Sequence, residues 1–475
     1  MSQLNITRKI RNKWAVFQEK KKESPLLRNV YKLFKTCLIA ALAIILLNLT
    51  DLPAETRNAL FLLILATGLW VTEAIPPFAV SLLIMGFAVV FIADNKSEGH
   101  WEQYVNTWSS PTMWLLMGGF FLAQGAVNTG LDKLFARYTL KRFGEKPNQV
   151  LFSVMLVTLI LSLFISNTAT AALMIITITP LTEKLGKNDP LSKSLSLGVA
   201  VTAAVGGMGT IISTPANLIA AGVIASKGLK MGFTEWLYFG LPLCVGLVYF
   251  LWIFLKYTYR SNLRRVNIDE LLGEENTASL DREIILKRTV AIITTLLTII
   301  LWVISSYINI PLAVVSFVPI ICFTVTGIIT AEDIPKLPWD TLILVAGSLT
   351  LGMAVTNTGL ADYFVNAIKF DSSSILVIFI VLAYVSSIVS NFMSTTAAAS
   401  ILIPIGATLL PTHTEAVCSL IALSVSTATI LPISTPPNAI VYSSGILKAS
   451  DFRAAGLLLG GIGPLIIAVL MFIIF

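Results

Sequence analysis

The pentapeptide Ser213-Thr214-Pro215-Ala216-Asn217 lies in a long apolar stretch and returns 221 residues later as Ser434-Thr435-Pro436-Pro437-Asn438. In both copies a threonine precedes a proline. This arrangement begins a helix, because the hydroxyl caps the first turn and proline fits the first helical position. The surrounding stretches, 194–225 and 416–446, are long enough to cross a membrane. A helix start inside each stretch predicts two membrane spans that are broken at the midplane.

Two further apolar stretches carry a second repeated motif, Ser166-Asn167-Thr168 in 149–180 and Ser390-Asn391 in 373–410. Lysines and arginines flank 149–180 on both sides. Both its ends therefore belong on the cytoplasmic face, and the segment is predicted to be a re-entrant hairpin. The flanks of 373–410 are poor in Lys and Arg, which predicts a hairpin that enters from the outer face. Both motifs are predicted to lie at the hairpin tips and to cap the second limb of each hairpin.

A third repeated motif, Asn128-Thr129-Gly130 and Asn357-Thr358-Gly359, extends this internal duplication. The charged linker 259–288 is cytoplasmic by its loop charge, so the two copies are predicted to cross the membrane in opposite directions, as inverted repeats do in secondary transporters. The predicted division is a basic arm (1–35), a first transmembrane helix and loop (36–57), repeat one (58–258, hairpin 149–186), the linker (259–288) and repeat two (289–475, hairpin 373–410).

The composition of the chain is that of a membrane protein. Of 475 residues, 56% are hydrophobic and 12% are charged, about half the charge of an ordinary soluble domain. The arm 1–35 holds ten Lys/Arg and two Glu, which is +8, so the rest of this +7 chain sums to −1. These values exclude a soluble globular fold and intrinsic disorder, and they argue against a nucleic-acid partner. We expect an all-α polytopic membrane protein with about 11 transmembrane helices plus two re-entrant hairpins.

The basic arm predicts a cytoplasmic N-terminus, and an odd number of spans then places the C-terminus on the extracytoplasmic side of the plasma (inner) membrane. Apolar residues interleave with the basic ones, which suits either a segment lying on anionic membrane lipid or a solvated tail. Glu73, in Glu73-Ala74-Ile75-Pro76-Pro77, fits either the cap of a tight turn between two helices or a functional intramembrane acid.

The segments that carry the motifs contain no Asp, Glu, Lys, Arg or His, namely 149–180, 194–226, 373–410 and 416–447. Four helix N-termini would bring partial positive charge and free N–H groups to the midplane, which suits a small anion such as a carboxylate. Carbonyls, hydroxyls and the amides of Asn167 and Asn391 offer oxygen ligands, which suit Na⁺. Acid–base and metal-ligating side chains are missing from these segments, so neither an enzyme nor a cofactor is predicted.

The motifs resemble those of the divalent anion:sodium symporter (DASS) family, the INDY-type di- and tricarboxylate transporters, over nearly the whole chain. The resemblance rests on Thr72-Glu73-Ala74-Ile75-Pro76 and on the paired Ser-Asn and Ser-Thr-Pro motifs. It implies a homodimer whose transport domain moves against a scaffold domain by an elevator mechanism. It also implies a carboxylate site formed by Ser166, Asn167, Thr168, Thr214, Pro215, Ser390, Asn391, Thr435 and Pro436. One Na⁺ would lie near Ser162, Asn167 and Ser213, and a second near Ser386, Asn391 and Ser434.

The second hairpin motif departs from the family pattern, because Phe392 stands where the family has Thr. Ser394, Thr395 and Thr396 follow within a turn and can supply the missing hydroxyl, while bulky Val389 weakens the second Na⁺ site. The family includes Na⁺-independent exchangers, so both Na⁺-coupled symport and dicarboxylate exchange (antiport) stay open. The expected cargo is a dicarboxylate of the succinate, malate, fumarate and 2-oxoglutarate class, since no fixed positive charge balances a third carboxylate. The alternative is an anion channel with the same broken helices.

Overall fold

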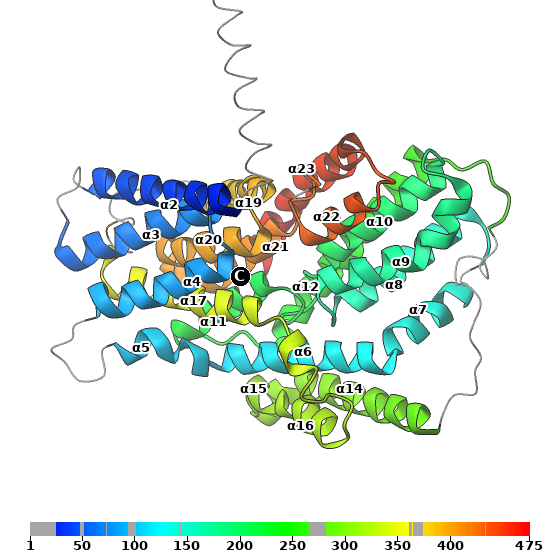
Figure 1. Ribbon diagram of the computed structural model, residues 1–475, viewed down its shortest axis with the longest axis horizontal. Helices are drawn as coiled ribbons and strands as arrows, with labels where there is room; N and C mark the ends of the chain where they lie inside the picture. The colour runs from blue at the N-terminus through cyan, green and yellow to red at the C-terminus, as the bar shows by residue number, and fades with distance from the viewer. Residues whose placement is uncertain are drawn as a thin grey trace, which may run out of the picture.

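The computed structural model describes residues 25–475 apart from 48–51, 73, 94–100, 143, 267–281, 361–362, 364–373 and 433. Most of the basic arm and Glu73 therefore lie outside the described residues. Within the described ranges every regular element is a helix (Figure 1), which confirms the all-α expectation.

The first half of the chain contains α2 (Pro25–Leu47), α3 (Ala54–Thr72), α4 (Pro77–Phe87), α5 (Glu102–Val105), α6 (Pro111–Thr129), α7 (Leu131–Arg142), α8 (Pro147–Ser162), α9 (Asn167–Leu185), α10 (Pro190–Gly206), α11 (Pro215–Ser226) and α12 (Phe233–Thr258). The second half contains α14 (Arg282–Ile308), α15 (Leu312–Val315), α16 (Phe317–Val325), α17 (Trp339–Asn357), α19 (Ile375–Phe392), α20 (Thr395–Leu409), α21 (Thr414–Val425), α22 (Pro436–Ser443) and α23 (Ala449–Ile474).

Six of the described helices are long and apolar enough to cross a membrane: α3, α12, most of α14, α17, α19 and α23. A seventh span results if α20 and α21, which meet at an angle of 113°, are counted as one bent span. Helices α4, α8 and α11 are apolar but shorter, because each ends or begins at a break in the chain. The protein is thus an integral membrane protein, and the count of eleven spans stays a prediction.

The tight turn between two helices that the sequence allowed at 73–77 lies between α3 and α4. Helix α3 ends at Thr72 and α4 begins at Pro77, with proline in the first turn of the new helix. The Trp70 indole donates a hydrogen bond to the carbonyl of Pro77 at 3.3 Å and holds the two helices together across the turn. This part of the chain therefore forms two helices instead of one long helix, because proline inside a helix interrupts its hydrogen bonds.

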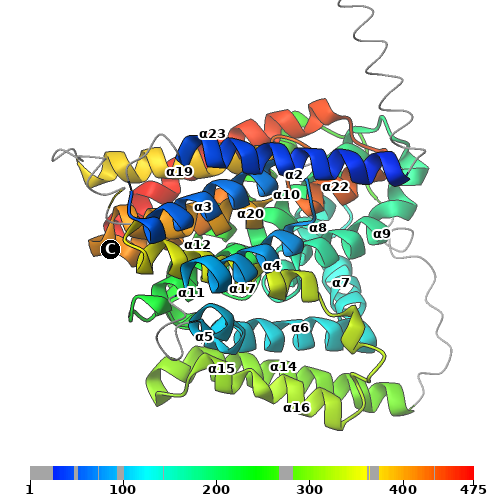
Figure 2. The same ribbon diagram turned by 60° about the vertical axis from the view of Figure 1, so that its left-hand side comes forward.

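Helix α6 lies between two groups of helices. Figure 2 shows α14, α15 and α16 as an outer layer on one side of α6, and α11 and α17 also pack against it. The close approach of α6 and α16 depends on Gly125, because a Cβ at this position would collide with the ring of Phe323. Small residues allow such close helix contacts in membranes.

The second half of each broken helix packs against the other half of the chain. Helix α11 packs against α20 and α21, whereas α22 packs against α9 and α10. Figure 1 shows α22 beside α10, although the two helices are far apart in the sequence. The two halves are therefore interlocked at the breaks.

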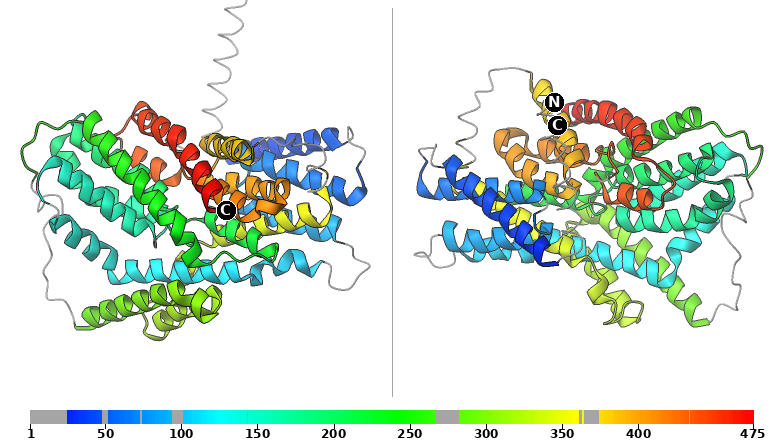
Figure 3. Two further views of the ribbon diagram at one scale, coloured as in Figure 1. Left: turned by 180° about the vertical axis from the view of Figure 1, so that it is seen from behind. Right: turned by 45° about the horizontal axis from the view of Figure 1, so that its top comes forward.

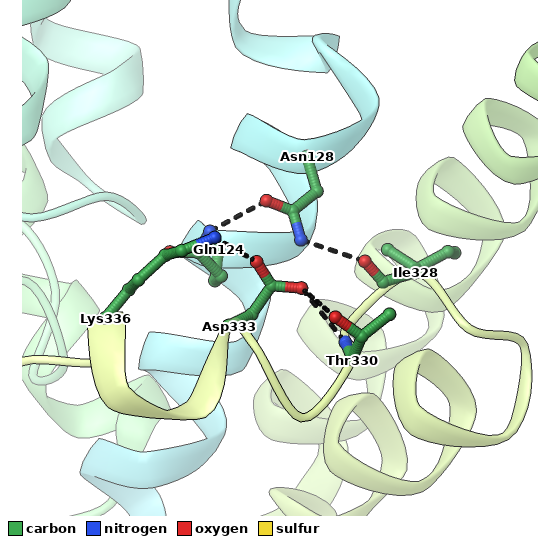
Figure 4. A network of polar contacts seen from close by, with 6 residues as sticks. All are labelled: Gln124, Asn128, Ile328, Thr330, Asp333 and Lys336. Atoms are coloured by element: carbon green, nitrogen blue, oxygen red, sulfur yellow. Dashed lines mark hydrogen bonds and ion pairs between the residues drawn. The ribbon is translucent and has the colours of Figure 1, made fainter.

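The motif Asn128-Thr129-Gly130 ends α6 and ties it to the second half of the chain (Figure 4). The Asn128 amide donates to the carbonyl of Ile328 at 2.9 Å and accepts from Gln124 at 2.7 Å. The loop that follows Ile328 is held by Asp333. The Asp333 carboxylate accepts two hydrogen bonds from Thr330 at 3.0 Å and one from Lys336 at 2.9 Å. The backbone N–H of Thr330 and the Lys336 ammonium lower the pKa of Asp333 to about 2.

Asp333→Asn is expected to destabilise this loop in a pH-dependent way. A carboxylate whose pKa is lowered on folding stabilises the folded state above its unfolded pKa, near 3.8, and loses this contribution as the pH falls toward 2. Because Lys336 is 60% exposed, we expect only about 1 kcal/mol at pH 7 after solvent screening. Thermal unfolding in detergent should separate the wild type from the variant at pH 7, and the difference should shrink at pH 3. An equal difference at both pH values would contradict the assignment.

Candidate functional site

Both predicted broken spans are broken in the structure. Helix α10 ends at Gly206 and α11 begins at Pro215, while α21 ends at Val425 and α22 begins at Pro436. Thr214 and Thr435 are the N-caps, and their hydroxyls accept hydrogen bonds from the backbone N–H of Asn217 and Asn438, each at 3.3 Å. The Thr-Pro helix starts are therefore confirmed.

Asn217 and Asn438 hold the two breaks in shape. The Asn217 amide donates to the carbonyls of Gly207 and Thr210, both at 2.8 Å, and the Asn438 amide donates to those of Leu431 at 3.1 Å and Thr429 at 3.3 Å. Both side chains are fully buried, and among the described residues neither amide oxygen has a hydrogen-bond donor. Sequence reasoning assigned no role to these asparagines, although each ends a repeated pentapeptide.

Asn217→Ala is expected to lower the free energy of unfolding by about 2–4 kcal/mol, because two buried carbonyls each lose a hydrogen bond. Thermal unfolding of the purified protein in detergent measures this change. Ser226→Ala is the matched control on α11, since its hydroxyl bonds only within its own helix. If both variants melt alike, Asn217 does not hold the break.

The first hairpin motif lies directly against the first break. Helix α8 ends at Ser162 and α9 begins at Asn167, with Ser166 as the N-cap that accepts from the N–H of Ala169 at 3.3 Å. The Ser162 hydroxyl lies 2.7 Å from both the Asn167 amide oxygen and the carbonyl of Ala203. The predicted cap at Ser166 is therefore confirmed, and hydroxyl, amide and carbonyl oxygens meet here.

The break between α10 and α11 closes over Asn167. Gly207 approaches so closely that a Cβ on it would collide with the Asn167 amide and with Thr214. Ser213 lies within hydrogen-bond distance of the carbonyls of Gly207 and Thr210. Ser162, Asn167 and the loop that carries Ser213 are thus brought together.

The second hairpin differs from the prediction. Helix α19 continues to Phe392, so Ser390 and Asn391 lie in its last turn and do not cap the second limb. The cap of α20 is Ser394, which accepts from the N–H of Ala397 at 3.2 Å. The predicted cap at Ser390-Asn391 is therefore wrong. The physical reason is that Met393 has an extended backbone, and Ser394 is the first hydroxyl residue after it.

Both polar atoms of the Asn391 side chain form hydrogen bonds within the protein. Its amide oxygen accepts from the N–H of Ile430 at 3.0 Å, and its amide nitrogen donates to the carbonyl of Ser387 at 2.9 Å. Ser386 and Ser434 bond to carbonyls of their own segments, at Leu382 and Leu431. No hydrogen bond among the described residues joins Ser386, Asn391 and Ser434 to one another, in contrast to the first set.

The tips of both hairpins are partly open to the surroundings. Ser166, Thr168 and Pro436 are exposed, and Phe392 has 71% of its surface exposed, whereas Thr214 and Thr435 are buried. Among the described residues no three His, Cys, Asp or Glu side chains form a metal cluster. The arrangement offers uncharged donors and acceptors only.

Comparisons with known proteins place this arrangement in context. A family model described as citrate transporter matches residues 67–425. The chain is 27% identical to the sodium-dependent dicarboxylate transporter SdcS of Staphylococcus saprophyticus, over 96% of this chain and 93% of the relative. It is 30% identical to an uncharacterized transporter of Schizosaccharomyces pombe over 85% of this chain, and 28% identical to the inorganic phosphate transporter PHO87 of Saccharomyces cerevisiae over 71%.

The chain spans 48% and 37% of the length of these two yeast relatives. Among solved structures it is similar to the YdaH transporter of Alcanivorax borkumensis, with a TM-score of 0.56 and 12% identity over 88% of this chain and 98% of that one. That likeness concerns the fold.

Proposed function

The chain belongs to the citrate transporter family, and on that basis we propose that it is a secondary active transporter of small dicarboxylates such as succinate, malate, fumarate and 2-oxoglutarate. The relatives named above are transporters, which confirms the DASS-type resemblance and supports the prediction that the chain is a transporter and not an enzyme. The observation that carries the proposal is the pair of Thr-Pro helix starts, whose helices α11 and α22 pack against α20 and α9, the second limbs of the two hairpins.

The proposed carboxylate site combines both hairpin tips and both breaks. It contains Ser166, Asn167, Thr168, Thr214, Pro215, Ser390, Asn391, Ser394, Thr435 and Pro436. Helices α9, α11, α20 and α22 begin at these residues, and the first N–H groups of a helix attract anions. Because neutral groups hold the anion without a fixed counter-charge, binding is weak enough to permit release. Two carboxylates need less compensation than three, which favours dicarboxylates over citrate.

Na⁺ is the proposed coupling ion, and the first set of oxygens supports its binding best. Ser162, Asn167 and the Ser213 loop present hydroxyl, amide and carbonyl oxygens to one another, the ligands that a hard cation prefers. A second ion at Ser386, Asn391 and Ser434 would have to compete with the N–H of Ile430 for the Asn391 amide oxygen. The similarity to sodium-dependent SdcS favours symport over exchange.

Na⁺ activation of transport is expected to have a Hill coefficient of about 1, because one set of ligands is available and the coefficient does not exceed the number of sites. Initial uptake rates at varied external Na⁺ measure it. Ser162→Ala should raise the Na⁺ concentration for half-maximal rate, whereas Ser434→Ala should leave it unchanged. A coefficient near 2, with both variants impaired, would restore the second site.

The packing also suggests how the molecule moves. The hairpins pack with the broken helices, while α14, α15 and α16 pack on α6 away from the hairpins. We infer a transport domain built around the hairpins and a scaffold built around α6, in two inverted repeats (58–258 and 289–475). The scaffold would hold a homodimer in the plasma (inner) membrane, with the N-terminus cytoplasmic and the C-terminus outside. An elevator movement would then carry the site across.

Transport into proteoliposomes tests the proposed function. Labelled succinate should enter when an inward Na⁺ gradient is imposed, and an internal counter-substrate alone should drive uptake only if the protein is an exchanger. Competition by malate, 2-oxoglutarate, citrate and inorganic phosphate ranks the cargo, and stronger competition by phosphate would overturn the dicarboxylate assignment. Single-channel currents would favour the anion channel. No uptake in either mode would refute the proposal.

A further inference from the structure

Helices α12 and α23 lie along one another on one face of the molecule, as the green and red helices in the left view of Figure 3 show. Both are 26 residues long and apolar enough to cross a membrane. The ring of Phe239 near the start of α12 lies 6.1 Å from the ring of Phe475 at the end of α23. The two helices are therefore antiparallel neighbours, and the line between them is called the α12–α23 seam here.

A hollow of about 410 Å³ runs along the middle of this seam. Pro242, Gly246 and Phe250 line it from α12, and Ile462, Ile466 and Leu470 line it from α23. Every lining residue is apolar. A Cβ on Gly246 would meet no atom within 4 Å, so the hollow is open at the position where α12 has no side chain.

The seam continues toward a polar end. A second hollow of about 250 Å³ lies next to the first and is lined by Phe239 and Ile474, one helical turn beyond Pro242 and Leu470. Lys230, Glu235 and Glu415 also line it. The seam therefore leads from an apolar groove to a rim that carries charges of both signs.

The dimensions of the seam select an occupant. From Phe239 to Phe250 the helix rises about 16 Å, which is close to half of the roughly 30 Å hydrocarbon core of a bilayer. The hollow follows about 12 Å of α12 from Pro242 to Phe250, and its lining is apolar throughout. A single extended alkyl chain of one leaflet matches this length and this lining, and the charged rim beyond Phe239 matches a zwitterionic headgroup.

We propose that the α12–α23 seam binds one phospholipid with a zwitterionic, ethanolamine-type headgroup. One acyl chain lies in the groove against Gly246 and Ile466. The phosphate lies near Lys230 and the ammonium near Glu415, so each charge of the headgroup meets its opposite. The site is independent of the transported solute.

Photo-crosslinking tests this site on the full chain in nanodiscs. The probe is a phosphatidylethanolamine with a diazirine on its acyl chain, and mass spectrometry locates the label. Labelling is expected to concentrate on the peptides around Gly246 and Ile466. Gly246→Phe should lower labelling of the α23 peptide about tenfold, the factor that corresponds to losing about two buried methylene contacts. Val245→Phe is the matched control, because Val245 is 45% exposed and does not line the groove.

Several outcomes decide the proposal. Equal labelling of the seam and of α14, whose apolar face is largely exposed, would overturn the site. Equal labelling by a phosphatidylglycerol probe with the same acyl chain would overturn the headgroup assignment. If Gly246→Phe does not elute as a folded protein in gel filtration, Ile466→Trp fills the groove from the opposite helix, and unchanged labelling of that variant would refute the site.

Discussion

Asn167→Ala is expected to reduce the initial rate of succinate uptake about 100-fold or more. Asn167 is the first residue of α9, and its amide contacts both Ser162 and the first break. Under the proposed function it supplies ligands to the carboxylate and to Na⁺, and the loss of two interactions of about 1.4 kcal/mol each corresponds to about 100-fold. Proteoliposome uptake at saturating Na⁺ measures the change.

The thermal stability of the Asn167→Ala variant should stay close to that of the wild type. The amide nitrogen makes one long bond, at 3.4 Å to the carbonyl of Ala204, and the Ser162 hydroxyl that donates to the amide oxygen keeps the carbonyl of Ala203 as an acceptor. Asn391→Ala should instead lose thermal stability as well as transport, because the N–H of Ile430 and the carbonyl of Ser387 each lose a hydrogen-bond partner. Asn148→Ala, at the exposed base of the first hairpin, is the control for Asn167→Ala. Transport by Asn167→Ala at the rate of this control would exclude Asn167 from the site.

Gly207→Ala is expected to abolish uptake to a similar extent by a different route. The added Cβ would collide with the Asn167 amide and with Thr214, so the first break and the first hairpin would have to separate. Overpacking of this kind costs about 1–3 kcal/mol, and it displaces two proposed ligands at once. Succinate uptake and thermal unfolding of the same preparation measure the two effects.

Gly86→Ala is the matched control for this substitution, because a Cβ on Gly86 of α4 meets no atom within 4 Å. It should transport like the wild type. If Gly207→Ala also transports normally, then Asn167 does not need the position it occupies in this structure, and the proposed site has to be moved.

Local chemistry along the chain predicted much of the architecture. The Thr-Pro pairs at 214–215 and 435–436 announce helix starts, since a hydroxyl cap and a proline at the first position act within four residues. The turn before Pro77 and the cap at Ser166 are equally local. Such signals need no knowledge of the partner segments.

The second hairpin shows where local reasoning stops. By repeat alignment Ser390-Asn391 corresponds to Ser166-Asn167, yet α19 continues through Asn391 and the cap moves to Ser394. The N–H of Ile430, in the break that lies against the hairpin, donates a hydrogen bond to the Asn391 amide oxygen. A residue 39 positions away thus decided the role of this asparagine.

The amino-acid sequence therefore determined that this protein is an all-helical membrane protein with two interrupted spans, because composition and helix capping act locally. Only the tertiary structure decided which halves pack together and which oxygens meet. Asn217 and Asn438 receive their roles from carbonyls that the chain brings back after a break, and α11 and α22 find their partners in the opposite half of the molecule. The crossed packing of these two helices depends on buried surfaces that form only when the whole chain is folded.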